Sequence, residues 1–231
     1  MVQMAVKRAY YGNDNDLDYF ERVFQSANIN FLIGSGASLP AISVLGNIEN
    51  ELQELINKDD EENYFNKAAE FLGTVWRPHE YLLGRKGKVI VTPEFEQNIS
   101  TTRGNYDKFI SSLEKILTRR RTGLLPRRIN IFTTNYDLFI EDASIRNSNV
   151  VLNDGFSKRA DLWGGCSFDG GSFYHTINAT GNLYNYKVEL PTINLIKMHG
   201  SLSWLNENNK IIYELPPFEP LAFKNEEAKK A

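Results

Sequence analysis

A short apolar run passes directly into a glycine-rich turn in residues 31–38, Phe31-Leu32-Ile33-Gly34-Ser35-Gly36-Ala37-Ser38. The apolar part predicts a short buried strand, and glycine lets a backbone turn tightly and approach a phosphate closely. The N-terminus of a helix that follows such a turn favours negative charge. The spacing is only part of the dinucleotide fingerprint, because Leu39 stands where a third glycine would be. Taken alone, the turn fits a tight strand-to-helix connection without a ligand equally well.

Two further apolar runs end in polar tips. Residues 128–132 predict a second strand, which passes into Thr133-Thr134-Asn135-Tyr136-Asp137. Residues 193–198 predict another strand, which ends in His199-Gly200. Taken alone, the first of these tips is explained as well by capping of the next helix. A lone histidine is more often a satisfied surface or core residue than a functional one.

Helical periods alternate with these strands. Apolar residues recur every three to four positions over 14–27, 46–57, 62–72 and 105–119, and residues 150–152 favour one more short strand. The Gly-, Asn- and Ser-rich stretch 153–190 predicts loops with β-hairpin segments. The alternation predicts an α/β fold with a Rossmann-like, mostly parallel sheet flanked by helices, with helical and loop insertions. Ligands of such sheets bind outside the carboxyl ends of the strands, so three neighbouring tips would converge on one cleft.

Composition narrows the class of protein. The 231 residues include 26 basic and 29 acidic ones, a net charge of −3, so we expect no direct binding of nucleic acid. No apolar run approaches the roughly 20 residues that span a membrane, and the N-terminus lacks a signal-peptide core, which favours a cytoplasmic protein. Cys166 is the single cysteine and cannot build a zinc ribbon, so we expect no metal. Five arginines within 119–128 indicate a solvated helix end, or else a phosphate or partner contact.

The three tips, in this order along the chain, resemble the sirtuin family over residues 28–205. Residues 34–38 look like the family's glycine-rich nucleotide loop, residues 133–137 like its Thr-Gln-Asn-x-Asp motif, and His199-Gly200 like its catalytic pair. The sequences of residues 132–137 and 197–204 resemble the zinc-free sirtuin-like domains of bacterial antiphage systems more closely than the protein deacylases of the family. Those domains destroy cellular NAD. Two features depart from the family: Thr134 replaces its glutamine, and only residues 39–42 remain of its proline-rich nicotinamide loop.

The resemblance implies an NAD glycohydrolase that cleaves its substrate NAD to nicotinamide and ADP-ribose, as the NAD-depleting effector of an abortive-infection system. It implies three catalytic residues: Asn135 holds the ribose and positions water, Asp137 bonds the nicotinamide carboxamide, and His199 acts as general base. It assigns cofactor binding to Gly34, Ser35, Gly36, Ala37, Ser38, Thr133 and Thr134. NAD-dependent protein deacylation is one alternative, although in the family it depends on a four-cysteine zinc ribbon. A catalytically silent module that binds NAD or ADP-ribose is another.

The expected organisation has three parts: an N-terminal helical segment over 1–28, a sirtuin-like Rossmann domain over 29–220, and a charged tail or truncation point over 221–231. Only about 31 residues follow Gly200, where domains of the family continue with segments that bind the adenosine half of NAD. We therefore expect the domain to be incomplete at its C-terminal end. We also expect homo-oligomers, and the resemblance implies a partner such as a HerA-type ATPase or a short Argonaute.

Overall fold

The computed structural model describes residues 8–44, 48–85, 91–120, 125–156, 166–180 and 187–215. The stretch 221–231, for which the sequence predicts a charged tail, lies outside these ranges, as do residues 1–7 of the predicted N-terminal segment. The predicted domain boundaries at residues 28 and 220 stay predictions.

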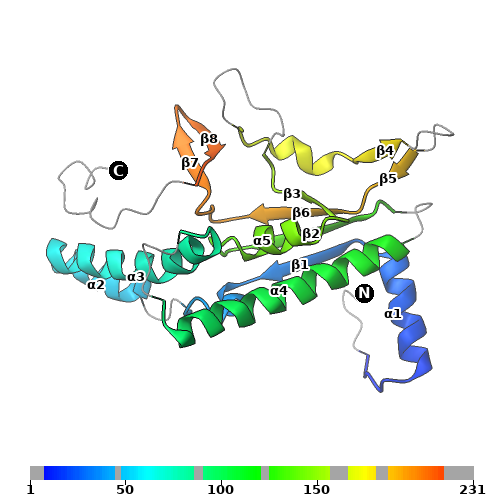
Figure 1. The fold of residues 1–231 in the computed structure, drawn as a ribbon, viewed down its shortest axis with the longest axis horizontal. Helices are drawn as coiled ribbons and strands as arrows, with labels where there is room; N and C mark the ends of the chain where they lie inside the picture. The colour runs from blue at the N-terminus through cyan, green and yellow to red at the C-terminus, as the bar shows by residue number, and fades with distance from the viewer. Residues whose placement is uncertain are drawn as a thin grey trace, which may run out of the picture.

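A four-stranded parallel sheet forms the centre of the fold (Figure 1). Its strands are β1 (Ile29–Ile33), β2 (Arg128–Thr133), β6 (Thr192–Lys197) and β3 (Val151–Asn153), in the order β1-β2-β6-β3. The register pairs Ile33 with Thr133 and Thr133 with Lys197, so β1, β2 and β6 end level with one another. The predicted α/β fold with a Rossmann-like parallel sheet is confirmed, and the three strands with unusual tips are direct neighbours.

The described ranges contain the helices α1 (Asp14–Ser26), α2 (Ile48–Asn57), α3 (Glu61–Leu82), α4 (Pro93–Arg119) and α5 (Phe139–Arg146). Two of them are longer than their periodicity predicts. α3 continues through Gly73 and Pro78, because burial of this segment outweighs its poor helix propensity. α4 begins at Pro93, where Thr92 Oγ1 accepts a hydrogen bond from Phe95 N at 3.1 Å. None of the helices in these ranges is long and apolar enough to cross a membrane.

One face of the sheet packs against α4 and α5 and forms the hydrophobic core. Every second side chain of β2 is fully buried there, as the pleat of a strand requires. The buried side chains come from α4 (Ile99, Ile110, Leu113, Leu117), the strands (Ile129, Ile131, Ile193, Leu195) and α5 (Phe139, Ala143). Burial of this apolar surface fixes β2 and β6, which carry two of the three tips, against two helices.

On the opposite face, four asparagines form a ladder of side-chain hydrogen bonds across all four strands. Asn130 Nδ2 donates to Asn30 Oδ1 at 2.8 Å, and Asn194 Nδ2 donates to Asn130 Oδ1 at 2.9 Å. Asn153 Nδ2 continues the row to Asn194 Oδ1 at 3.1 Å. The strand register places these residues side by side, so a slip of one strand would break every bond that it makes. The ladder therefore helps to keep the strand ends level.

Two short hairpins complete the described part of the chain: β4 (Asn178–Thr180) with β5 (Lys187–Glu189), and β7 (Trp204–Glu207) with β8 (Lys210–Tyr213). The first agrees with the hairpin segments predicted within 153–190. The second follows the third tip, and the rings of Trp204 and Tyr213 pack on Phe156 at 5.7 and 5.6 Å. Gly155 has φ +87°, and a Cβ there would lie 2.4 Å from the ring of Phe168, so only glycine fits.

Arg120 is buried and attaches α1 to the rest of the fold. Its guanidinium donates to the carbonyl oxygens of Phe24 and Ala27 at the end of α1, at 3.0 and 2.6 Å. It also donates to Pro126 O at 2.9 Å, and the residue is only 1% exposed. The prediction of a solvated helix end is therefore wrong for Arg120, because its fixed fork of donors satisfies carbonyls where separate segments meet.

Candidate functional site

The three predicted tips meet at one end of the sheet. The arrows of β1 and β6 point toward the side of the molecule where α2 and α3 lie (Figure 1). A cavity of about 230 Å³ opens there, and we call it the small cavity. All three tips contribute to its lining, which consists of Ser35, Ser38, Ile42, Ser43, Phe71, Val75, Thr134, Asn135, Tyr136, Asp137 and His199. The convergence that the sequence predicts for parallel neighbours is therefore present.

Ser38 connects the first tip to the second through its hydroxyl group. Its Oγ donates to Asp137 Oδ2 at 2.5 Å and accepts a hydrogen bond from Asn135 Nδ2 at 3.1 Å. Tyr106 of α4 places its hydroxyl 3.0 Å from the same oxygen. Because the single hydroxyl proton of Ser38 goes to Asp137, Tyr106 must donate here, and burial raises the pKa of Tyr106 so that it stays protonated. All four side chains are buried.

The side-chain oxygen of Asn135 is buried and has no hydrogen-bond partner among the described residues. The orientation of the amide is nevertheless fixed, because Nδ2 is held by Ser38 and the backbone N–H donates to Thr133 Oγ1 at 3.0 Å. A buried acceptor without a donor costs about 1–3 kcal/mol. Asn135 also lines the small cavity, so it is a candidate for contact with a ligand there.

The two threonines of the second tip have different surroundings. Thr133 is buried and does not line the small cavity. Its Oγ1 donates to Ile33 O at 3.0 Å and accepts from Asn135 N, so this hydroxyl already holds the tip against β1. Thr134 is one of the residues that line the cavity. Of the two predicted cofactor-binding threonines, only Thr134 has access to this cavity.

The third tip places His199 at the solvent-exposed edge of the small cavity. Its ring lies 6.4 Å from the ring of Tyr136, centroid to centroid. The following residue, Gly200, has φ +90°, a left-handed conformation that favours glycine. The histidine thus sits on a sharp turn, beside the cavity and exposed to water.

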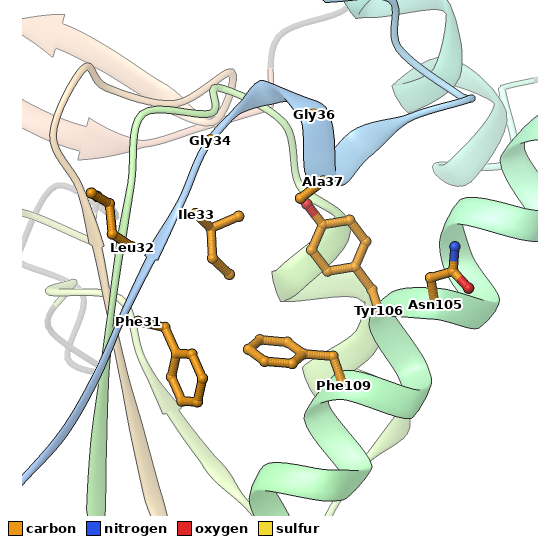
Figure 2. A pocket seen from close by; sticks show the side chains of 9 residues that line it. All are labelled: Phe31, Leu32, Ile33, Gly34, Gly36, Ala37, Asn105, Tyr106 and Phe109. Carbon is orange, nitrogen blue, oxygen red and sulfur yellow. The ribbon is translucent and has the colours of Figure 1, made fainter. Parts of the chain in front are cut away.

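A second cavity of about 470 Å³, which we call the large cavity, lies against β1 and α4 (Figure 2). It is lined by Phe31, Leu32, Ile33, Gly34, Gly36, Ala37, Asn105, Tyr106 and Phe109. Figure 2 shows the hydroxyl of Tyr106 directed at the turn near Ala37. Residues 34–38 are thus divided between the two cavities: Gly34, Gly36 and Ala37 face the large one, and Ser35 and Ser38 face the small one.

The glycines of the first tip are not required by backbone geometry. Gly34 has φ −109°, and Gly36 does not adopt positive φ either. A Cβ at either position would meet no atom of the described residues within 4 Å. The missing side chains instead leave open space beside the backbone. The turn continues as the single-turn 3-10 helix η1 (Ser35–Ser38), so the expected α-helix N-terminus at this point is absent from the described structure.

Sequence reasoning missed the apolar wall of the small cavity and the tyrosine behind it. Ile42 follows the first tip, whereas Phe71 and Val75 come from α3. A helical stripe identifies such residues as core, but their spacing does not show which of them border a cavity. Tyr106 was detectable, because it is a hydroxyl-bearing residue on the apolar stripe of α4, one turn before Phe109.

The chain matches no family model, and no curated protein matches it. Within the described ranges, no three His, Cys, Asp or Glu side chains gather in a way that could hold a metal ion. The resemblance to sirtuins thus rests on the three tips themselves.

Proposed function

We propose that this protein is a cytoplasmic NAD glycohydrolase. The observation that carries the proposal is that Asn135 lines a cavity bordered by all three strand tips and has a buried side-chain oxygen without a partner among the described residues. Dinucleotide binding and acid–base chemistry at a ribose need a particular set of groups around one cavity. These groups are a glycine turn, an amide, a carboxylate and an imidazole.

In the proposed complex, the nicotinamide and its ribose occupy the small cavity. Its volume of about 230 Å³ and its apolar wall of Ile42, Phe71 and Val75 suit a flat aromatic ring. The pyrophosphate crosses the turn at Gly34 and Gly36, where a Cβ would meet no atom of the described residues within 4 Å. The remainder of the dinucleotide extends toward the large cavity.

The proposed reaction breaks the bond between the ribose C1′ and the nicotinamide nitrogen. The electron pair of this bond stays on the nitrogen, nicotinamide leaves neutral, and positive charge develops on the ribose. Asp137 is only 6% exposed, and its carboxylate accepts from Ser38 and from Phe139 N, at 2.5 and 3.3 Å. A carboxylate fixed in a site of low dielectric stabilises such a charge, in addition to its proposed bond to the carboxamide. Water then adds to C1′, Asn135 Oδ1 orients it, and its proton passes to His199 and on to solvent.

The test is incubation of purified protein with NAD, followed by chromatography of nicotinamide and ADP-ribose. We expect Asn135→Ala and His199→Ala to abolish product formation. Asn178→Ala and His175→Ala, which alter the same residue types outside both cavities, should retain wild-type turnover. Wild-type rates in either of the first two variants would contradict the assignment. Acyl-peptide turnover coupled to nicotinamide release would instead support a deacylase.

One observation favours the binding module as the second candidate. Both carboxylate oxygens of Asp137 already accept hydrogen bonds from the protein, as in a site built to hold a ligand without further rearrangement. A silent module predicts that calorimetry detects binding of NAD or ADP-ribose while chromatography detects no product.

We further propose that NAD depletion serves antiphage defence by abortive infection, in an assembly of several copies of the chain with a HerA-type ATPase or a short Argonaute. This proposal is supported by the resemblance of the three tips alone. Cells that carry the protein with its co-purified neighbours should lose NAD on phage infection, and cells that carry Asn135→Ala should not.

A further inference from the structure

We infer that His79 and Lys197 are positioning residues that together hold the peptide group between Asp137 and Leu138. Neither side chain lines the small cavity, so each would act through the second tip and not on a ligand. The catalytic consequence of this inference rests on the proposed function, whereas its structural content does not.

The peptide group between Asp137 and Leu138 is held at both of its polar atoms. Lys197 Nζ donates to the carbonyl oxygen of Asp137, and Leu138 N donates to His79 Nε2 at 3.0 Å. The two side chains come from different elements, α3 and the end of β6. Because a peptide group is planar, directional hydrogen bonds at its oxygen and at its nitrogen restrain the orientation of the whole group. The direction in which the Asp137 side chain leaves the backbone, toward Ser38, is thereby set.

His79 is suited to this contact because it is held as a neutral acceptor. It is 2% exposed, and its Nδ1 lies 2.6 Å from Val75 O. Since Nε2 accepts from Leu138, the ring proton is on Nδ1, where it donates to Val75 O. The charged groups that act on the ring are Asp137, Lys197 and Glu80. Burial is the largest influence and lowers the pKa of His79 to about 4, so the ring is neutral at pH 7.

Lys197 links the same peptide group to two further parts of the fold. Its side chain is 3% exposed, and Nζ also contacts Glu141 Oε1 of α5 at 2.7 Å and Ser201 Oγ at 3.0 Å. The three protons of the ammonium group are thus used on three segments. His199 follows Lys197 by two positions, so one lysine sets the spacing between the second tip and the third.

A buried ion pair is a poor means of adding stability, because desolvation of both charges offsets their attraction. The pair of Lys197 and Glu141 also leaves Glu141 Oε2 without a partner among the described residues. The desolvation cost of this pair is explained if Lys197 serves to fix the orientation of the peptide group and, with it, of the Asp137 side chain. Misplacement of a catalytic side chain by about 1 Å lowers rates by roughly 100-fold.

The test compares variants that keep or remove the hydrogen bonds of His79 and Lys197 to the peptide group between Asp137 and Leu138. His79→Gln keeps an acceptor near the position of Nε2, whereas His79→Leu removes it. Lys197→Met combined with Glu141→Gln removes the ammonium together with its counter-charge, so no lone buried charge remains. Hydrogen exchange of the Leu138 amide measures the contact by NMR, and the Ile131 amide in the centre of β2 reports whether the fold is intact. Crystal structures of the same variants measure the Ser38–Asp137 distance, which is 2.5 Å in the native chain.

We expect His79→Leu to accelerate Leu138 exchange by at least about tenfold and to lose the Ser38–Asp137 contact, with Ile131 unchanged. His79→Gln should restore both. For NAD, kcat should fall by about 10- to 100-fold in His79→Leu and in the lysine–glutamate double variant, with KM within about threefold. If the Ile131 amide of His79→Leu loses its protection from exchange, that variant is not folded. The double variant then tests the inference through the Ser38–Asp137 distance and kcat.

Unchanged Leu138 exchange, or a retained Ser38–Asp137 contact, in a folded His79→Leu variant overturns the inference, and so does a retained Ser38–Asp137 contact in the folded double variant. Wild-type kcat in a variant that has lost the contact overturns it as well. If the native protein cleaves no NAD, the proposed function fails on its own. Exchange and the crystallographic distance then still decide whether His79 and Lys197 orient Asp137.

Discussion

The hydroxyl group of Ser38 donates to the carboxylate of Asp137 at 2.5 Å across 99 positions of the chain. This bond joins the glycine turn after β1 to the polar tip after β2, and both residues are buried. The amide of Asn135 and the hydroxyl of Tyr106 depend on the same serine oxygen. The arrangement of the candidate site thus rests on one small side chain, whose hydroxyl group donates one hydrogen bond and accepts two.

Replacement of Ser38 with alanine should damage both stability and activity. It leaves Asn135 Nδ2, the Tyr106 hydroxyl and Asp137 Oδ2 without this partner in a buried setting, so the free energy of unfolding should fall by about 1–3 kcal/mol. NAD cleavage should fall by about 100-fold. Urea denaturation and product chromatography measure the two effects. Ser112→Ala, which removes a hydroxyl that bonds Lys108 O on the exposed side of α4, is the control. A Ser38→Ala protein as stable as this control would refute the network.

Replacement of Gly36 with alanine should affect ligand binding and leave stability unchanged. Its backbone accepts alanine and its Cβ would meet no atom of the described residues within 4 Å, so the free energy of unfolding should change by less than about 0.5 kcal/mol. The added methyl group narrows the approach to the backbone, and the Kd for ADP-ribose should rise by about tenfold. Calorimetry measures the affinity.

The matched control for Gly36→Ala is Gly155→Ala, which should show the reverse pattern. Its Cβ would lie 2.4 Å from the Phe168 ring at φ +87°, so we expect a loss of more than about 2 kcal/mol. Native affinity for ADP-ribose in Gly36→Ala would argue against a ligand at this turn.

The asparagine ladder predicts graded losses of stability across the sheet. Asn194 is 2% exposed and bonds both Asn130 and Asn153, so Asn194→Ala should cost about 2–3 kcal/mol. Asn30 is exposed at the end of the row, and Asn30→Ala should cost less than about 0.5 kcal/mol. Urea denaturation of both variants checks the order, and equal losses would show that the ladder does not act as a row.

Stability should fall as the pH is lowered from about 6.5 to about 4, and part of the loss should trace to His79. An unfolded histidine has a pKa of about 6.5, and burial lowers the pKa of His79 to about 4. Between these values the unfolded chain binds more protons, so stability rises with pH. The contribution of His79 is fully present above pH 6.5 and falls by about 3 kcal/mol through this window.

His79→Gln separates this contribution from that of the carboxylates. Unfolding free energies of the native chain and of His79→Gln, measured at about pH 7 and about pH 4, should converge as the pH falls. A difference between the two proteins that stays constant with pH would rule out a neutral, buried His79.

Some of the helix boundaries depend on tertiary packing and so escape local rules. Gly73 and Pro78 indicate the end of a helix, yet α3 continues past both because Val75, His79 and Glu80 are buried. Arg120 lies in a basic cluster typical of a solvated surface, yet it is enclosed by carbonyl oxygens from α1 and from the segment before β2. In both cases the partners are distant in sequence, and no window of neighbouring residues contains them.

Local sequence alone predicts the parallel α/β class and the three tips, because apolar runs and the residues that follow them are properties of short stretches. The tertiary structure decides that β1, β2 and β6 are neighbours with level ends, since strand order and register depend on packing between distant segments. It also decides that the Thr133 hydroxyl bonds Ile33 O of β1 and that the Tyr106 hydroxyl bonds Ser38 Oγ. In the same way it brings His79 Nε2 to the Leu138 amide, next to the second tip. These roles follow from hydrogen bonds that form only once the chain has brought separate elements together.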